Sequence, residues 1–124
     1  MNTGNKVKDD RSKKRLSTVH NDLQRLFRHM AAAERRFVVT EGLRSQERQR
    51  ELVAAGASRT MNSKHLTGRA VDIAVVVGSE VRWDWPLYEA FAAEVKAAAA
   101  ILGIKITWGG DWPTFKDGPH FELA

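Results

Sequence analysis

The stretch SKHLTGRAVDIAVVV, residues 63–77, joins a polar loop to a run of small and β-branched apolar residues. Residues 57–69 are rich in Ser, Thr, Asn and Gly, which predicts a loop. Residues 70–77 alternate at first and then become continuously apolar, which predicts a buried strand. Because successive side chains of a strand point to opposite faces, Asp72 is expected to face away from Val71 and Ile73. The stretch therefore places a carboxylate on a strand that directly follows the loop carrying His65.

The flanking sequence predicts the other elements. Apolar residues at spacings of three and four predict an amphipathic helix over residues 17–33, with Ser17 as its N-cap. Ser45 caps a second helix that runs to residue 55, and Pro86 lies in the first turn of a third that ends near Leu102. Residues 78–85 are predicted to be a turn-rich connection. Further strands are predicted at residues 37–40, 104–108 and 120–123. The fold class is therefore α+β, with about three helices packed on a small antiparallel sheet.

The bulk composition limits the classes of protein. A length of 124 residues favours a single domain, in which residues 1–11 are expected to be flexible. The absence of cysteine excludes disulfides, thiolate metal sites and a cysteine nucleophile. Apolar runs all fall well short of the roughly 18 residues that a membrane span needs, so stable membrane insertion is not expected. The polar, charged N-terminus does not have the pattern of a secretory signal peptide.

The chain is basic, with a net charge of +5 from 20 basic and 15 acidic residues. A basic protein favours polyanionic partners such as nucleic acid, an anionic envelope or an acidic wall polymer. The sequence has no recognisable nucleic-acid-reading motif and no repeated basic–aromatic pattern, so nucleic acid is not expected as a partner. A solvated basic leader explains the same charge without any specific partner.

Two motifs, HLTGRAVD at 65–72 and DGPH at 117–120, supply two imidazoles and two carboxylates. A catalytic zinc site needs three ligands from His, Asp or Glu and often a carboxylate base beside the bound water. His65, Asp72 and His120 can be the ligands, and Asp117 can be the base. Taken alone, His65 reads as a surface histidine, and Asp117 with His120 is a common C-terminal pair. Asp72 is harder to explain otherwise, because an isolated buried carboxylate is costly.

These residues carry a family resemblance. Ser63-x-His65-x-x-Gly68-x-Ala70-x-Asp72 followed by Asp117-x-x-His120 resembles the signature of the zinc-dependent DD-peptidases and LD-endopeptidases, which include the VanX- and VanY-type D-Ala-D-Ala peptidases. Within that family the chain is most similar to the small phage endolysins of the L-alanyl-D-glutamate peptidase type. The segments EGLRS (41–45), WGGDW (108–112) and FKDGPHFEL (115–123) agree, so the resemblance covers residues 36–124. Leu43 and Gly118 stand where the family often has aromatic residues.

The resemblance implies a Hedgehog/DD-peptidase-like fold and one Zn²⁺ per chain, held by His65, Asp72 and His120. It implies that zinc activates a water, that Asp117 acts as general base, and that Arg44 faces the developing oxyanion. Further residues are expected to bind substrate or to pack around the site: Ser63, Arg69, Trp108 and Trp112.

The function implied is hydrolysis of the L-alanyl-D-glutamate bond in the peptidoglycan stem peptide by a phage-type endolysin. We expect a monomer without a separate cell-wall-binding domain, which acts on the wall after release from the host cytoplasm through a holin. Two alternatives remain open. The first is a D-alanyl-D-alanine carboxypeptidase or dipeptidase that uses the same zinc site. The second is a non-catalytic cell-wall-binding module.

Overall fold

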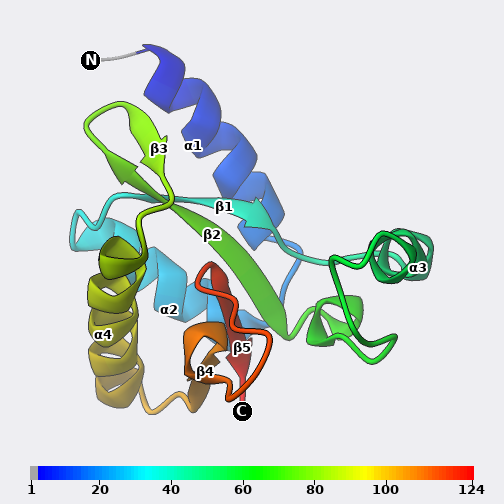
Figure 1. Ribbon diagram of the computed structural model, residues 1–124. Helices are drawn as coiled ribbons and strands as arrows, with labels where there is room; N and C mark the ends of the chain where they lie inside the picture. The colour runs from blue at the N-terminus through cyan, green and yellow to red at the C-terminus, as the bar shows by residue number, and fades with distance from the viewer. Residues whose placement is uncertain (1–2) are drawn as a thin grey trace.

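The computed structural model of the chain describes residues 3–124, which form four α-helices, two short 3₁₀ helices and five strands (Figure 1). In chain order the elements are α1 (Thr3–Leu16), α2 (Asn21–Ala32), β1 (Phe37–Glu41), α3 (Gln46–Ala54), η1 (Lys64–Thr67), β2 (Ala70–Val77), β3 (Glu80–Arg82), α4 (Trp85–Leu102), β4 (Ile106–Trp108), η2 (Gly109–Asp111) and β5 (His120–Leu123). The predicted α+β class is confirmed.

The five strands form one antiparallel sheet in the order β1-β2-β5-β4, with β3 pairing to β2 beside β5. The long strand β2 is central, as Figure 1 shows. Its residue Asp72 lies opposite Glu41 of β1 on one side and opposite His120 of β5 on the other. The register therefore brings three polar residues from three strands into one row across the sheet.

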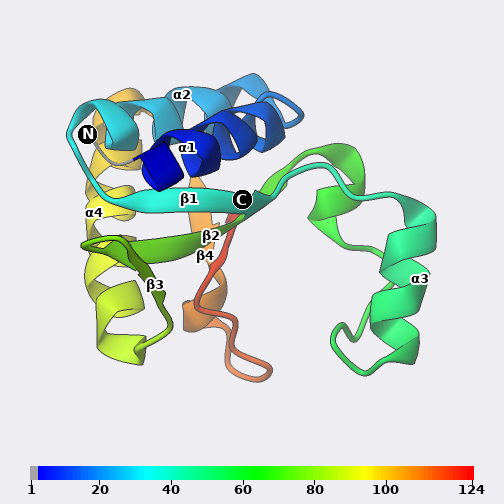
Figure 2. The same ribbon diagram turned by 90° about the horizontal axis from the view of Figure 1, so that it is seen from above.

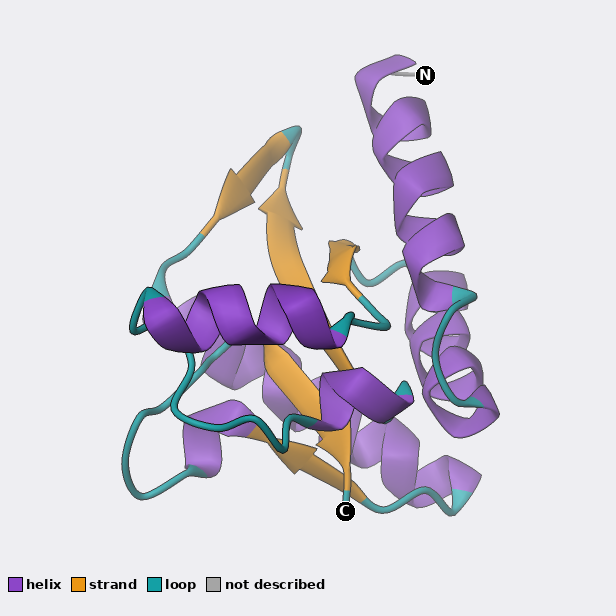
Figure 3. Ribbon diagram, turned by 90° about the vertical axis from the view of Figure 1, so that its right-hand side faces the viewer, coloured by secondary structure: helices purple, strands orange, loops and turns teal. Residues whose placement is uncertain are grey.

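The two faces of the sheet differ because side chains alternate along each strand. Val71 and Ile73 of β2, and Phe121 of β5, lie on one face and are fully buried. Phe121 meets the rings of Phe27 and Phe91 edge-on, at centroid distances of 5.7 and 6.0 Å. Burying one such side chain stabilises the fold by about 1.5–3 kcal/mol. This apolar face, which α2 and α4 cover (Figure 3), leaves the opposite face of the sheet for the polar row.

The helix predicted over residues 17–33 corresponds to α2, which begins four residues later than predicted. Residues 17–20 form a break between α1 and α2, and the N-cap of α2 is His20, whose Nδ1 accepts from the backbone N–H of Asp22 at 3.0 Å. Ser17 instead donates its hydroxyl to the carbonyl of Lys14 at 2.6 Å. The predicted N-cap was therefore wrong. Because Val19 is buried in the same core as Leu23 and Leu26 of α2, the apolar spacing extends in front of the true helix start and conceals it.

Residues 1–11 were expected to be flexible, and this stays a prediction; in the structure α1 is helical from Thr3, and residues 1–2 lie outside the described part of the chain. Basic residues in its last turn are favourable at the negative end of the helix dipole. The end of α1 also binds the free edge of β1. Ser12 Oγ accepts from the Val39 N–H at 2.7 Å, and Arg15 Nη1 donates to the Val39 carbonyl at 3.2 Å. Composition cannot show such long-range bonds.

The helix α3 stands apart from the other helices, as Figures 1 and 2 both show. Its predicted N-cap is confirmed, because Ser45 Oγ accepts from the Arg48 N–H at 3.0 Å. The predicted loop after α3 contains η1, and the predicted connection after β2 contains β3; both elements are too short to leave a periodic pattern. Within the described residues, no helix is long and apolar enough to cross a membrane.

Candidate metal centre

Three side chains from separate elements meet on the polar face of the sheet. His65 comes from η1, Asp72 from β2 and His120 from β5. The Nε2 atom of His65 and the Nδ1 atom of His120 each lie 3.2 Å from Oδ1 of Asp72. One ligand atom from each residue lies within 4.8 Å of the others, so the cluster could hold a metal ion. The structure therefore brings together the three predicted ligand residues.

The ring of His65 is oriented by a backbone carbonyl. Its Nδ1 lies 2.9 Å from the Gly42 oxygen, and the ring is almost fully buried. A carbonyl only accepts, so Nδ1 carries a proton and donates to it, which leaves Nε2 facing Asp72. Ser63 caps η1 by accepting from the His65 N–H at 3.2 Å, and Gly68 ends it at a φ of 70°. The short helix thus holds His65 from both ends.

Gly42 lies where only glycine fits. A Cβ atom there would collide with the Arg15 carbonyl oxygen and with Oγ1 of Thr18. The absence of a side chain lets the segment after β1 pass close to the end of α1. This close approach fixes the position of the Gly42 carbonyl, which accepts the hydrogen bond from Nδ1 of His65. A glycine in the EGLRS segment is thus connected to the tautomer of a metal-ligand candidate.

The ring of His120 is oriented by a carboxylate two residues further along β5. Its Nε2 lies 2.8 Å from Oε1 of Glu122, which leaves Nδ1 facing Asp72. Burial opposes the charged imidazolium, but the bonds to Asp72 and Glu122 outweigh it and raise the pKa of His120 to about 9. Lys64 Nζ lies 3.2 Å from the other oxygen of Glu122 and, together with His120, lowers the pKa of that carboxyl against its burial.

The two aspartates of the site have opposite electrostatic environments. Burial favours neutral Asp72, yet hydrogen bonds from His120 and His65 hold its pKa well below the ordinary range. Burial and the nearby Asp72 carboxylate raise the pKa of Asp117. The backbone N–H of Asp117 donates to the Gly109 carbonyl at 3.1 Å, and this bond fixes the turn that leads to His120. Two carboxyls whose pKa values are pushed apart are typical of an active site with separate charged and proton-transferring roles.

Arg44 lies beside the cluster with only 8% of its side chain exposed. Its Nη2 is 3.6 Å from Oδ2 of Asp72. Its Nε donates to Oε2 of Glu41 at 2.9 Å, and its Nη1 donates to Oε1 of Gln49 at 2.7 Å. Burial lowers the pKa of the guanidinium, but the bond and charge of Glu41 outweigh this and raise it. Arg44 is therefore a fixed cation at the edge of the candidate centre.

The four residues that were predicted to bind substrate or to pack around the site differ in their burial and contacts. Ser63 holds the loop through its cap, and Trp112 lies over the ring of His120 at a centroid distance of 5.0 Å. Arg69 is half-buried, and its backbone pairs with Lys64 and Leu123. Trp108 is only 6% exposed, and its indole N–H donates to the Gly118 carbonyl at 2.7 Å. Its burial supports a packing role and does not favour direct contact with substrate.

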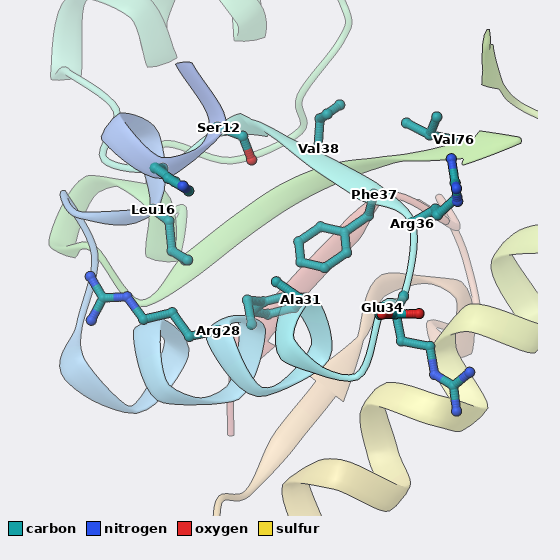
Figure 4. A pocket seen from close by; sticks show the side chains of 12 residues that line it. Ser12, Leu16, Arg28, Ala31, Glu34, Arg36, Phe37, Val38 and Val76 are labelled. Carbon is teal, nitrogen blue, oxygen red and sulfur yellow. The ribbon is translucent and has the colours of Figure 1, made fainter. Parts of the chain in front are cut away.

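Two hollows mark the surface. One, of about 820 Å³, lies between α3 and η1 and is lined by Arg44, Met61, Ser63 and others, so it adjoins the candidate centre. The other, of about 750 Å³, lies between α1, α2 and β1, where Leu16 and Phe37 meet several basic side chains (Figure 4). The three ligand candidates line neither hollow, but Arg44, which contacts Asp72, lines the first. The first hollow is therefore the one connected to the chemistry.

The sequence predicts no role for three residues of the site: Glu41, Gln49 and Glu122. A pattern for Glu122 was available, because residues i and i+2 of a strand share a face and so it had to lie beside His120. Glu41 and Gln49 flank Arg44, but their bonds to it depend on the turn between β1 and α3, which spacing alone does not define.

A His–Asp–His set with two buried, oriented imidazoles, next to a carboxyl of raised pKa and a fixed arginine, is typical of a metal-dependent hydrolase. The family model of the phage L-alanyl-D-glutamate peptidase matches residues 6–124, and the chain belongs to this family.

Known relatives of the chain support this family assignment. The L-alanyl-D-glutamate peptidase of Escherichia phage T5 is 35% identical over 91% of this chain and 94% of its own length. The L-alanyl-D-glutamate peptidase of Listeria phage A118 is 38% identical over 69% of this chain. The peptidoglycan L-alanyl-D-glutamate endopeptidase CwlK of Bacillus subtilis is 35% identical over 69% of it. The match spans only 30% of the Listeria phage protein and 59% of CwlK.

Solved structures extend the comparison. The L-Ala D-Glu endopeptidase ChiX of Serratia marcescens superposes with a TM-score of 0.86 and 47% identity, over 94% of this chain and 88% of that one. The D,D-dipeptidase VanXYg superposes with a TM-score of 0.52 and 23% identity, over 83% of this chain and 47% of that one. The latter likeness concerns the fold alone and confirms the predicted DD-peptidase-like architecture.

Proposed function

We propose that the chain is a phage-type endolysin that hydrolyses the L-alanyl-D-glutamate bond of the peptidoglycan stem peptide with one Zn²⁺. The observation that carries this proposal is the His65–Asp72–His120 cluster, in which Gly42 and Glu122 have already oriented both imidazoles. The family and the names of the relatives supply the bond and the substrate.

Zinc fits the donor set on chemical grounds. Two imidazole nitrogens and one carboxylate oxygen are typical ligands of a catalytic zinc with an open position. The hydrogen bonds from Nδ1 of His65 and Nε2 of His120 leave the other nitrogen of each ring as the ligand. When bound, the ion would lower the pKa of a water and polarise the scissile carbonyl.

The protein's own residues supply the remaining steps. Asp117 accepts a proton from the attacking water and delivers it to the leaving amine, and its raised pKa makes it a stronger base for the first of these transfers. Arg44 holds a positive charge beside the carbonyl oxygen as negative charge develops there. Trp112 and Arg69 are proposed to contact the stem peptide, together with Ser63 at the edge of the hollow.

The biological setting is part of the same proposal. The chain acts as a monomeric catalytic domain, is made in the host cytoplasm, and reaches the wall after holin-mediated release. Its net positive charge would favour binding to an anionic envelope.

The test is mass spectrometry of purified peptidoglycan after digestion by zinc-loaded protein, with chelated protein and the His65→Ala variant as controls. A new N-terminal D-Glu that needs zinc is the expected result. Release of free D-Ala would instead assign the protein to the D-Ala-D-Ala carboxypeptidases or dipeptidases. Intact peptidoglycan at full zinc loading would overturn the proposal and favour a binding module.

A further inference from the structure

Gln49 is the one buried residue of α3, a helix whose other side chains are exposed or half-buried. Its side chain has no exposed surface. Burying a primary amide is costly unless its hydrogen bonds are made inside the protein. The amide of Gln49 therefore needs hydrogen-bond partners inside the protein.

The amide of Gln49 joins two parts of the site. Its Oε1 accepts from Nη1 of Arg44 at 2.7 Å, while its Nε2 donates to the Thr60 carbonyl at 2.6 Å and to Ser58 Oγ at 2.9 Å. Arginine only donates and a carbonyl only accepts, so the amide has a single orientation. Gln49 thus links the arginine to the loop that leads to Ser63 and His65.

Arg44 is held from two sides. Glu41 binds Nε and Nη2 in a bidentate pair, and Gln49 binds Nη1. The plane of the guanidinium is therefore fixed, and the Nη2 edge faces Asp72. A planar donor held in this way loses little conformational freedom when it makes a further hydrogen bond.

We infer that Gln49 is a positioning residue, which orients Arg44 toward the reacting carbonyl and connects that orientation to the 58–60 loop. This inference rests on the proposed function, because the role of Arg44 in the reaction belongs to it. Gln49 itself does not touch the substrate. A small displacement of a catalytic group can cost up to about a hundredfold in rate, so an indirect effect on turnover is expected.

The test compares two substitutions of similar size in zinc-loaded protein. Gln49→Met removes all three hydrogen bonds, whereas Gln49→Glu keeps an oxygen that can accept from Arg44. Each is made alone and together with Arg44→Ala, and kcat and KM are measured on a soluble stem peptide. Arg50→Ala, an exposed change on the same helix, is the matched control.

We expect Gln49→Met to lower kcat about tenfold or more at unchanged zinc content, and to add less than about twofold in the Arg44→Ala background. Gln49→Glu keeps the acceptor for Arg44 but loses both bonds to the 58–60 loop, so its kcat should lie between those of Gln49→Met and wild type. Equal losses in both backgrounds, or a change in KM alone, would overturn the inference. If Gln49→Met does not fold, Gln49→Glu is judged by the same comparison: a loss of kcat that disappears in the Arg44→Ala background supports the inference, and an equal loss in both backgrounds overturns it. A wild-type protein that leaves the stem peptide uncut refutes the proposed function instead.

Discussion

Replacing Glu122 by alanine removes the carboxylate that orients His120. Its Oε1 lies 2.8 Å from Nε2 of that ring, in a part-buried site where only 17% of the Glu122 side chain is exposed. Without this acceptor the ring can rotate or adopt the other tautomer, and Nδ1 no longer faces Asp72 in one fixed state. The substitution therefore acts on metal binding through a residue that is not itself a ligand.

The expected size of the effect follows from the position of Glu122. Loss of a carboxylate that supports a metal-ligating histidine costs about 10- to 100-fold in metal affinity, which is about 1.4–2.7 kcal/mol. The ion pair with Lys64 is also lost, but the Lys64 side chain is 37% exposed and the pair contributes little. The loss of zinc affinity should thus exceed any loss of folding stability.

The assay is zinc competition against a chromogenic chelator, with the unfolding temperature of the metal-free protein measured in parallel. Glu80→Ala, an exposed glutamate change on β3, is the control. A Glu122→Ala protein that folds normally and binds zinc as tightly as wild type would refute the role given to Glu122.

Further predictions concern the other site residues. His65→Ala should lose zinc and activity together, as metal analysis and peptide cleavage can show; zinc retained at full stoichiometry would exclude it as a ligand. Asp117→Asn should keep zinc but lower kcat by about 10²–10⁴-fold, the usual contribution of a general base; near-normal turnover would remove Asp117 from the reaction. Arg44→Ala should lower kcat by about 10²–10³-fold with little change in KM, as expected for a group that stabilises the transition state; an effect on KM alone would assign it to substrate binding. In the metal-free protein the pKa of His120 is raised from 6.5 to about 9, so its stabilising charge is fully present below pH 6.5 and lost as the pH rises through 9. The unfolding temperature of chelated protein should therefore fall over that interval, and a constant value would contradict the pairing with Asp72.

Much of the site could be predicted because successive side chains of a strand point to opposite faces of the sheet. The apolar residues of 70–77 define the core face, and Asp72 then has to lie on the other one. Ser45 and Pro86 mark helix starts through local backbone chemistry, and the structure confirms both. Local rules were sufficient for these features, which depend on neighbours in the chain.

Other features depend on contacts between distant segments and left no local pattern. The start of α2 after His20 is concealed because Val19, which precedes it, packs into the same core as Leu23 and Leu26. The bonds of α1 to Val39 join residues more than twenty positions apart. The orientation of His65 by Gly42 likewise depends on a chain crossing that only the folded structure reveals.

The most direct test of the account is titration of metal-free protein with zinc while cleavage of a defined L-alanyl-D-glutamate peptide is followed. The account predicts that activity rises with bound zinc, reaches a plateau at one ion per chain, and is absent from the His65→Ala protein over the same range. Full cleavage by the metal-free protein, or by His65→Ala without bound zinc, would contradict it.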